Sequence, residues 1–425
     1  MSTVPLQRLG RFLCTTRAPY QAAVFRIGFA AVVAAFLLRE WPHRRVLFGD
    51  RSPLSYDMAL TLIEQEGTFS VLSWWGGRLW FELVYGLTIM AALAVMAGWR
   101  TRTTTILFMV GVMSLENRNT LVGDGGDNII RIMVIYLVFT RCAEVWSLDA
   151  RRARAARARS TEAREPRVPA DRTGIVLWTV TGALLFWAFG LPPQPGWPLV
   201  LWLLWAVHGV WYVVNRRLPE HEVRSVLDSC AAMLHNAAML VIAAQVCLIY
   251  STAGWYKIQG VRWQEGSALH YALHLDYFTP WPWLSAAVSA NAVLVLALTY
   301  LTVAAQVAFP FTLGSRKVKN VLLAVMIMEH LGIAVLLGIP FLSLVMVVCD
   351  AVFLPTALLL GLRTRFGRFG RFGRFGRLVG RRSGGPVSHD PDTTVPREPD
   401  AVHPKESDAQ TQAEEPVTPE PASKA

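Results

Sequence analysis

Long apolar stretches alternate with short polar segments through most of the chain. Several of these stretches run about 17 to 25 residues with few charges, the length that a helix needs to cross a hydrocarbon core about 30 Å thick. The spans that the pattern predicts are 21–39, 79–97, 104–116, 129–146, 174–190, 198–214, 231–256, 286–311, 320–337 and 340–361. The chain is therefore expected to be all-α, a polytopic transmembrane helical bundle of about ten spans between residues 21 and 362. The count depends most on the short block 104–116 and on 320–361, which mainly Gly338 and Pro340 interrupt.

Positive charge is distributed regularly between these predicted spans. The formal net charge is +11, and the arginines and lysines gather in every second connecting segment. The basic segments are 8–17, 100–102, 151–172, 216–224, 316–319 and 363–382. Because cytoplasmic loops retain Lys and Arg, this alternation predicts that both termini, including residues 1–20, lie in the cytoplasm of a multi-pass cell-membrane protein. Basic residues placed in this way indicate membrane topology with the lipid bilayer as partner, and no nucleic acid partner is expected.

Three segments outside the predicted spans have distinct compositions, and the first is the exception to the alternation. The first outer loop, 40–78, is long and mixes arginines with acids, so it is either a subdomain outside the membrane or re-enters the membrane at residues 69–75. Residues 363–382 repeat Arg-Phe-Gly and are expected to be a basic juxtamembrane segment that contacts anionic lipid. Residues 383–425 are rich in Pro, Glu, Asp, Ser and Thr, a composition that predicts a disordered tail.

Ionisable residues within apolar segments are costly in a bilayer and therefore indicate functional or paired positions. Those in or beside the predicted spans are Arg26, Glu116, Asp127, Arg131, His208, His235, Lys257, Glu329, His330 and Asp350. Glu329 and His330 are adjacent, so they point about 100° apart on a helix and cannot both face lipid comfortably. A buried hydrogen-bonded arrangement and proton handling are the two interpretations of this pair.

Lys257 lies in the most informative segment, residues 250–271. It follows Tyr250 by seven positions and Gly254 by three, so the three residues share a helical face, and Gly254 leaves room for a neighbouring helix or a ligand. Aromatic residues, Trp263 among them, surround it in the sequence. Lys257 either extends its ammonium to the lipid headgroups, as helix-end lysines do, or is a partly desolvated base.

A second polar cluster precedes the fourth predicted span. Asn117 and Asn119 are followed by a glycine-rich loop, and Asp127 and Arg131 are four residues apart, a spacing that permits an ion pair. One interpretation is helix capping and turn formation, and the other is binding of an anionic ligand.

These segments together resemble a known family. The matching patterns are Phe25-Arg26-Ile27-Gly28, Asn117-Arg118-Asn119, Gly125-Gly126-Asp127 with Arg131, and Ala253-Gly254-x-x-Lys257 followed by Trp263-x-Glu265-Gly266-x-Ala268-x-x-Tyr271. They resemble the HTTM family of membrane proteins, which are similar to the vitamin K-dependent gamma-carboxylase, over residues 20–360. The resemblance implies that Lys257 is a catalytic base that acts with a reduced quinone as cofactor. Asn119 stands where the carboxylase has a functional histidine, so the resemblance leaves glutamyl carboxylation, and with it an enzymatic role, open.

Three classes of function follow from the segments and the resemblance. The first is a membrane enzyme that uses Lys257 on a lipid quinone or a small secreted peptide, and the second is a non-catalytic partner in peptide maturation or export, as in bacterial relatives from a sporulation-delaying toxin system. The third is a transporter. Lys257, Arg26, Asp127 and Arg131 are expected to line one polar pocket, because each is otherwise an uncompensated charge in the membrane. The further predicted binding residues are Asn117, Asn119, Trp263 and Glu265, and no metal site is expected.

Overall fold

The computed structural model describes residues 10, 12–162, 171–188, 196–218 and 220–362, and within these it contains helices and no strands. The helices of the first half are α2 (Pro19–Arg39), α3 (Arg44–Leu47), α4 (Tyr56–Gln65), η1 (Val71–Ser73), α5 (Arg78–Ala97), α6 (Thr101–Glu116), α7 (Gly125–Val138), α8 (Leu148–Glu162), α9 (Arg172–Ala188) and α10 (Trp197–Arg217). Those of the second half are α11 (Glu222–Gln259), α12 (Val261–Gln264), α13 (Ala268–Ala272), η2 (Asp276–Phe278), α14 (Pro282–Ser289), α15 (Ala292–Ala308), η3 (Phe309–Thr312), α16 (Arg316–Leu336), α17 (Pro340–Asp350) and η4 (Ala351–Phe353). The predicted all-α class is confirmed. The basic segment 363–382 and the tail 383–425 lie outside the described residues.

Six of the described helices are long and apolar enough to cross a membrane. They are Pro19–Arg39, Arg78–Ala97, Trp197–Arg217, Glu222–Gln259, Ala292–Thr312 and Arg316–Leu336, and the bent pair Pro340–Phe353 and Thr356–Leu362 makes a seventh if it is one span. The prediction of a membrane protein is supported to this extent. Helices α6 and α7 have 16 and 14 residues, so they are about 24 and 21 Å long, shorter than a hydrocarbon core of about 30 Å. The count of ten spans and the cytoplasmic position of both termini stay predictions.

Two predicted boundaries are wrong. The block 129–146 was expected to be one span, but α7 ends at Val138 and residues 139–147 turn back irregularly. The carbonyl oxygens of Cys142 and Trp146 in this turn accept hydrogen bonds from the Arg26 side chain. The block 286–311 is divided, because α14 ends at Ser289 and Asn291 caps a new helix by accepting a hydrogen bond from the Leu294 amide. Apolar composition alone did not show either interruption.

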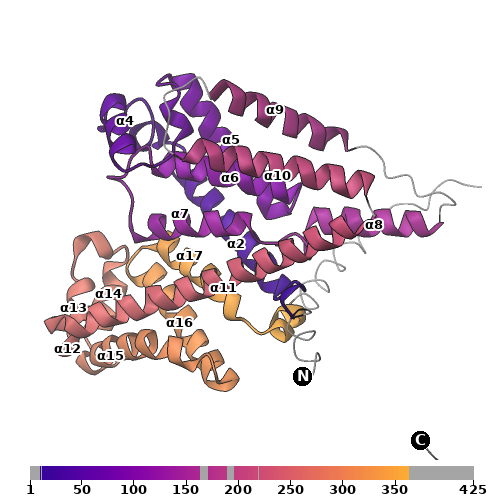
Figure 1. Ribbon diagram of the computed structural model, residues 1–425. Helices are drawn as coiled ribbons and strands as arrows, with labels where there is room; N and C mark the ends of the chain where they lie inside the picture. The colour runs from indigo at the N-terminus through magenta and orange to yellow at the C-terminus, as the bar shows by residue number, and fades with distance from the viewer. Residues whose placement is uncertain (1–9, 11, 163–170, 189–195, 219, 363–425) are drawn as a thin grey trace, which may run out of the picture. The chain divides into compact units, whose positions relative to one another are not determined.

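Helix α2 lies among the helices of the first half and packs against α5 and against α17 from the other end of the chain (Figure 1). Its side chains Phe25 and Phe29 are fully buried, and Phe29 meets Phe108 of α6 edge to face. Helices α5, α6 and α7 follow one another in contact. The core of the described unit is therefore formed by elements that are far apart in the sequence.

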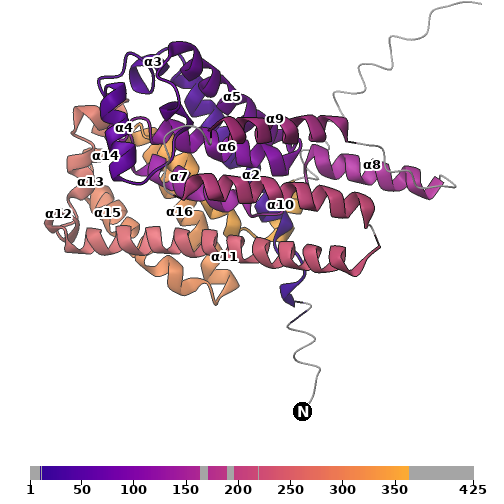
Figure 2. The ribbon, with the colours of Figure 1, turned by 45° about the horizontal axis from the view of Figure 1, so that its top comes forward.

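Helix α11 organises the second half of the chain. The helices α12 to α16 gather around one part of it, while α10 runs beside it and α9 lies on the far side of α10 in Figure 2. It contacts α15, α17 and α7, and it ends at Gln259, two residues after Lys257. This arrangement places Lys257 where α15 and α16 can reach it.

Candidate functional site

A chain of polar side chains joins three helices at the end of α11. The Lys257 ammonium donates a hydrogen bond to the Gln306 side-chain oxygen on α15 (2.9 Å), and the Gln306 amide nitrogen donates to Glu329 on α16 (2.6 Å). The amide can serve both neighbours in only one orientation, because the ammonium needs an acceptor and the carboxylate needs a donor. Gln306 is buried, and Lys257 and Glu329 are half-buried. Lys257 is therefore held by a partner within the helices and does not simply extend away from the protein.

Gly254 explains how α15 comes close enough to supply Gln306. A Cβ atom at Gly254 would lie 2.6 Å from a methyl group of Val307 and 3.2 Å from its backbone nitrogen. The close approach that was predicted for a neighbouring helix is thus observed, and it occurs at the residue next to Gln306. Because Gly254 and Lys257 are three residues apart, the same helical face carries the contact and the lysine.

A second group of polar side chains lies on α11, α16 and α17. The Tyr250 hydroxyl is 2.9 Å from both carboxyl oxygens of Asp350, and both residues are buried. The His330 ring lies 5.9 Å from the Tyr250 ring, and neither of its nitrogens has a hydrogen-bond partner among the described residues. His330 is only 6% exposed, so two hydrogen-bonding positions of the imidazole are buried without a protein partner. Burial of a polar group without a hydrogen-bond partner costs free energy, so this position calls for an explanation.

The segment that follows Lys257 brings the Trp263 ring close to the lysine. The Lys257 ammonium nitrogen is 5.2 Å from the centre of the Trp263 ring, which is a cation–π contact. Gly266 has a positive φ of 72°, and a Cβ atom there would collide with Leu296 of α15. Both the backbone conformation and the lack of space therefore favour glycine at this position. The Glu265 side chain is exposed. Trp263 is therefore brought to the lysine, while Glu265 is not part of the polar chain.

Arg26 lies elsewhere. Its guanidinium is fully buried and donates to the carbonyl oxygens of Val95, Met96, Cys142 and Trp146. Two of these carbonyls belong to the last turn of α5 and two to the loop 139–147 that follows α7, so Arg26 joins a helix end to a loop. The expectation that Arg26 shares one polar pocket with Lys257, Asp127 and Arg131 is wrong, because its hydrogen-bond partners are these four backbone carbonyls, and Asp127 lies in the first turn of α7.

The Asn117–Asn119 cluster holds the long loop before α5. Asn117 donates to the Phe69 carbonyl (2.7 Å), Asn119 donates to the Leu47 carbonyl (2.7 Å), and Arg118 donates to the Leu54 carbonyl (3.2 Å). All three side chains are buried. Their role in the structure is to fix the loop 47–69, which forms short helices.

Asp127 and Arg131 are not joined in an ion pair. Asp127 accepts from the Asp124 amide (2.7 Å), and Asp124 accepts from the Gly126 amide (2.6 Å) and the Asp127 amide, which makes a capping box at the start of α7. Arg131 donates instead to Asn117 and Asn128. The capping interpretation is confirmed, and the structure brings Arg131 together with Asn117 and not with Lys257.

The loop itself contains one charged contact outside the apolar helices. Arg45 and Asp50 form a two-point ion pair with distances of 2.9 and 2.6 Å. The Arg45 guanidinium lowers the pKa of Asp50 to about 2. The loop contains the short helices α3, α4 and η1, and its buried residues Phe69 to Leu72 pack beside Ser114 of α6. Whether it is a subdomain outside the membrane or re-enters at residues 69–75 stays a prediction with both alternatives.

Gln306 is the residue of the polar chain that the sequence prediction missed. It is uncharged, so a search for ionisable groups passes over it, although a glutamine between alanines and a valine in an apolar helix is itself unusual.

Together the side chains of these two polar groups supply a cation, two carboxyl groups, a phenol and an imidazole within neighbouring helices, an arrangement able to bind and deprotonate a weak acid. Within the described residues, no group of three or more His, Cys, Asp or Glu side chains is placed to hold a metal ion. Comparisons of the chain with family models, with curated proteins and with solved structures found no match.

Proposed function

We propose that this chain is an HTTM-like integral membrane protein in which Lys257 acts as the base on a lipid quinone or a small secreted peptide. The observation that carries the proposal is the hydrogen-bonded chain Lys257–Gln306–Glu329. Three apolar helices contribute one polar side chain each, and the three side chains meet. Ionisable residues in such positions are retained chiefly for function.

The surroundings of the lysine support a proton-transfer role. Glu329 lies beyond a neutral amide, so no carboxylate contacts Lys257 directly to hold it as the ammonium. Trp263 covers the ammonium and limits the access of water. The Tyr250–Asp350 pair and the unpartnered imidazole of His330 provide further donors and acceptors for a substrate oxygen.

A transporter is the second candidate, and one observation favours it. The helix pair Pro340–Phe353 and Thr356–Leu362 is bent by 115°, and Asp350 lies just before the bend. Broken helices beside a buried carboxyl group form ion and substrate sites in many transporters. A non-catalytic role in peptide maturation requires no particular state of Lys257, so the same lysine variants separate it from the enzyme.

The test compares cells that lack the protein with cells that carry variants of it. The lipid extract and the secreted peptides of each strain are analysed by mass spectrometry. The proposal expects a product that is lost in the deletion strain, restored by the wild-type chain, and not restored by Lys257→Met or Lys257→Arg, since a guanidinium does not deprotonate in proteins. Lys317→Met, at an exposed lysine on α16, is the matched control and is expected to restore it.

The class of the missing product distinguishes a quinone from a peptide. Full restoration by Lys257→Arg overturns the role as base and favours the partner interpretation. An unchanged product profile with altered accumulation of a solute favours the transporter. Equal membrane levels of the variants, measured by immunoblot, show that the loss is not caused by misfolding.

A further inference from the structure

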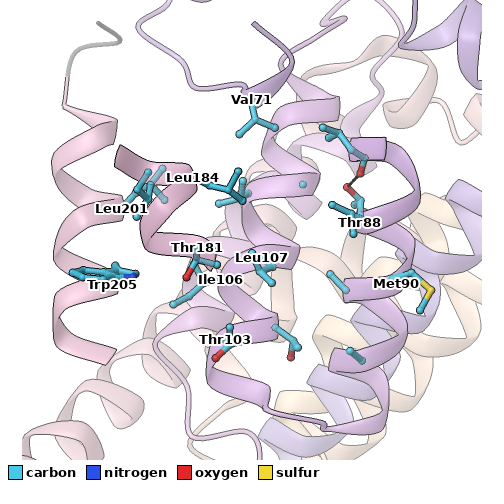
Figure 3. A pocket seen from close by; sticks show the side chains of 18 of the residues that line it. Val71, Thr88, Met90, Thr103, Ile106, Leu107, Thr181, Leu184, Leu201 and Trp205 are labelled. Atoms are coloured by element: carbon cyan, nitrogen blue, oxygen red, sulfur yellow. Dashed lines mark hydrogen bonds between the residues drawn. The ribbon is translucent and has the colours of Figure 1, made fainter. Parts of the chain in front are cut away.

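A large apolar chamber lies between the α5–α6 pair and the α9–α10 hairpin. Its volume is about 810 Å³, within the range of about 300–1,000 Å³ that is typical of small-molecule and cofactor sites. In Figure 3, Leu201 and Trp205 of α10 face the chamber from one side and Thr88 and Met90 of α5 from the other, with Leu107 between them. It shares no lining residue with the Lys257 site.

The α9–α10 hairpin is a rigid wall of this chamber. Trp178 of α9 and Trp205 of α10 stack with ring centres 4.0 Å apart, and each indole N–H donates to the other residue's backbone carbonyl (3.0 and 2.8 Å). The hairpin is fastened to the other helices at its two ends. Trp187 meets Trp74 and Trp80 at one end, and Arg100 forms an ion pair with Asp171 at the other. The chamber lies between these two points of attachment.

The chamber wall contains few polar groups, and the most distinct lie at one end. Thr103 Oγ1 and His208 Nε2 are 3.4 Å apart, and both residues line the chamber. In Figure 3, Thr103 is at the opposite end from Val71. Arg100 is paired with Asp171, and the guanidinium of Arg102 stacks on the Trp211 ring. Neither arginine lines the chamber, whereas a hydroxyl or carbonyl oxygen of a ligand can reach Thr103 and His208, which do.

The chamber opens sideways from the helices. Leu87 and Met90 on its rim are 60% and 63% exposed, while Thr88 and Leu201 on its inner walls are buried. The walls belong to apolar helices, two of which, α5 and α10, are long enough to cross a membrane. A side opening in such helices faces hydrocarbon. Water would gain few hydrogen bonds in this space, because each buried water needs two to four polar partners.

We infer that this chamber binds a neutral single-chain lipid, with the hydrocarbon chain along α5 and α6 and one hydroxyl or carbonyl oxygen at Thr103 and His208. The volume, the apolar walls, the uncharged polar end and the side opening each fit this ligand class. The lining contains no Lys or Arg that would bind the phosphate of a phospholipid inside the chamber. The site is independent of Lys257 and of the proposed base chemistry.

The experiment uses the full chain in detergent and a hexadecanol that carries a photoreactive diazirine and an alkyne tag. Labelled peptides are identified by mass spectrometry, and unlabelled hexadecanol or hexadecane is added as competitor. Labelling is expected on α5, α6, α9 and α10, with hexadecanol competing about two- to tenfold better than hexadecane, as one hydrogen bond in an apolar site predicts. His208→Phe should remove this preference while keeping the labelling, because it removes the hydrogen-bonding group and keeps the ring.

Leu107→Trp fills the middle of the chamber and should abolish the labelling. Leu240→Trp is the matched control, since Leu240 is exposed on α11 and does not line the chamber. Equal labelling of Leu107→Trp and the control, or equal competition by hexadecane and hexadecanol in the wild-type chain, overturns the proposal and indicates only general lipid contact. Leu107→Ala, which enlarges the chamber, keeps the test valid if Leu107→Trp fails to fold, because it should retain the preference for the alcohol.

Discussion

Arg26 illustrates how a buried charge is tolerated without an acidic partner. Four carbonyl oxygens, two in the last turn of α5 and two in the loop 139–147, accept hydrogen bonds from one guanidinium. The carboxyl end of a helix carries partial negative charge, which favours a cation there. The residue that the sequence indicated as a pocket residue is thus a structural connection between α2, α5 and the turn after α7.

Replacement of Arg26 by Met should strongly destabilise the protein. Each buried acceptor left without a donor costs about 1–3 kcal/mol, and several are left at once. Arg26→Lys should recover part of the loss, because an ammonium has three donors but lacks the planar fork. Thermal unfolding in detergent measures the effect. Leu38→Met at the exposed end of the same helix is the control, and equal midpoints for Arg26→Met and Leu38→Met would contradict the role of Arg26.

At the scale of elements, the contact between α11 and α15 determines the candidate site. Lys257 and Gln306 come from helices far apart in the sequence, and their hydrogen bond requires the helix backbones to approach at Gly254. Small residues allow such close helix contacts in membrane proteins. The polar chain is therefore a property of the helix pair and not of either helix alone.

Gly254→Val should separate α11 from α15 and break the Lys257–Gln306 hydrogen bond. Overpacking of this kind costs about 1–3 kcal/mol. Gly332→Ala is a useful contrast, because nothing lies within 4 Å of a Cβ atom there, and it should be neutral or stabilising by up to about 1 kcal/mol. The two variants are compared by thermal unfolding and by the product assay described for Lys257. A Gly254→Val protein with wild-type stability and activity would show that the close approach is dispensable.

At the scale of the whole molecule, the number of membrane crossings is the property still to be measured. Among the described residues, six helices meet the length and composition needed, and α6, α7 and α9 are shorter. The alternation of arginine between apolar blocks nevertheless predicts that the short helices cross as well. Tilt, local thinning of the bilayer and flanking polar residues allow short helices to do so.

Reporter fusions test this topology. Fusions at Arg157, Arg224 and Lys317 should report the cytoplasm, and fusions at Asp124, Trp197 and Glu265 should report the opposite side. The pair Asp124 and Arg157 tests α7 in particular, because the reporters flank it. The same side for both would remove that span from the count, and a cytoplasmic result at Glu265 would reverse the half of the chain that contains Lys257.

The apolar pattern by itself predicted the all-helical class, the positions of the six described helices that are long enough to cross a membrane, and the candidate groups Lys257, Glu329, His330 and Asp350. These features depend on local composition and on the cost of charge in hydrocarbon, both of which can be derived from one segment at a time. Only the tertiary structure decided which of these groups meet. It joined Lys257 to Glu329 through Gln306, assigned Arg26 to backbone carbonyls, used Asp127 as a cap and left a chamber beside α9 and α10. Such contacts depend on where distant helices pack and end, and no local pattern in the sequence contains that information.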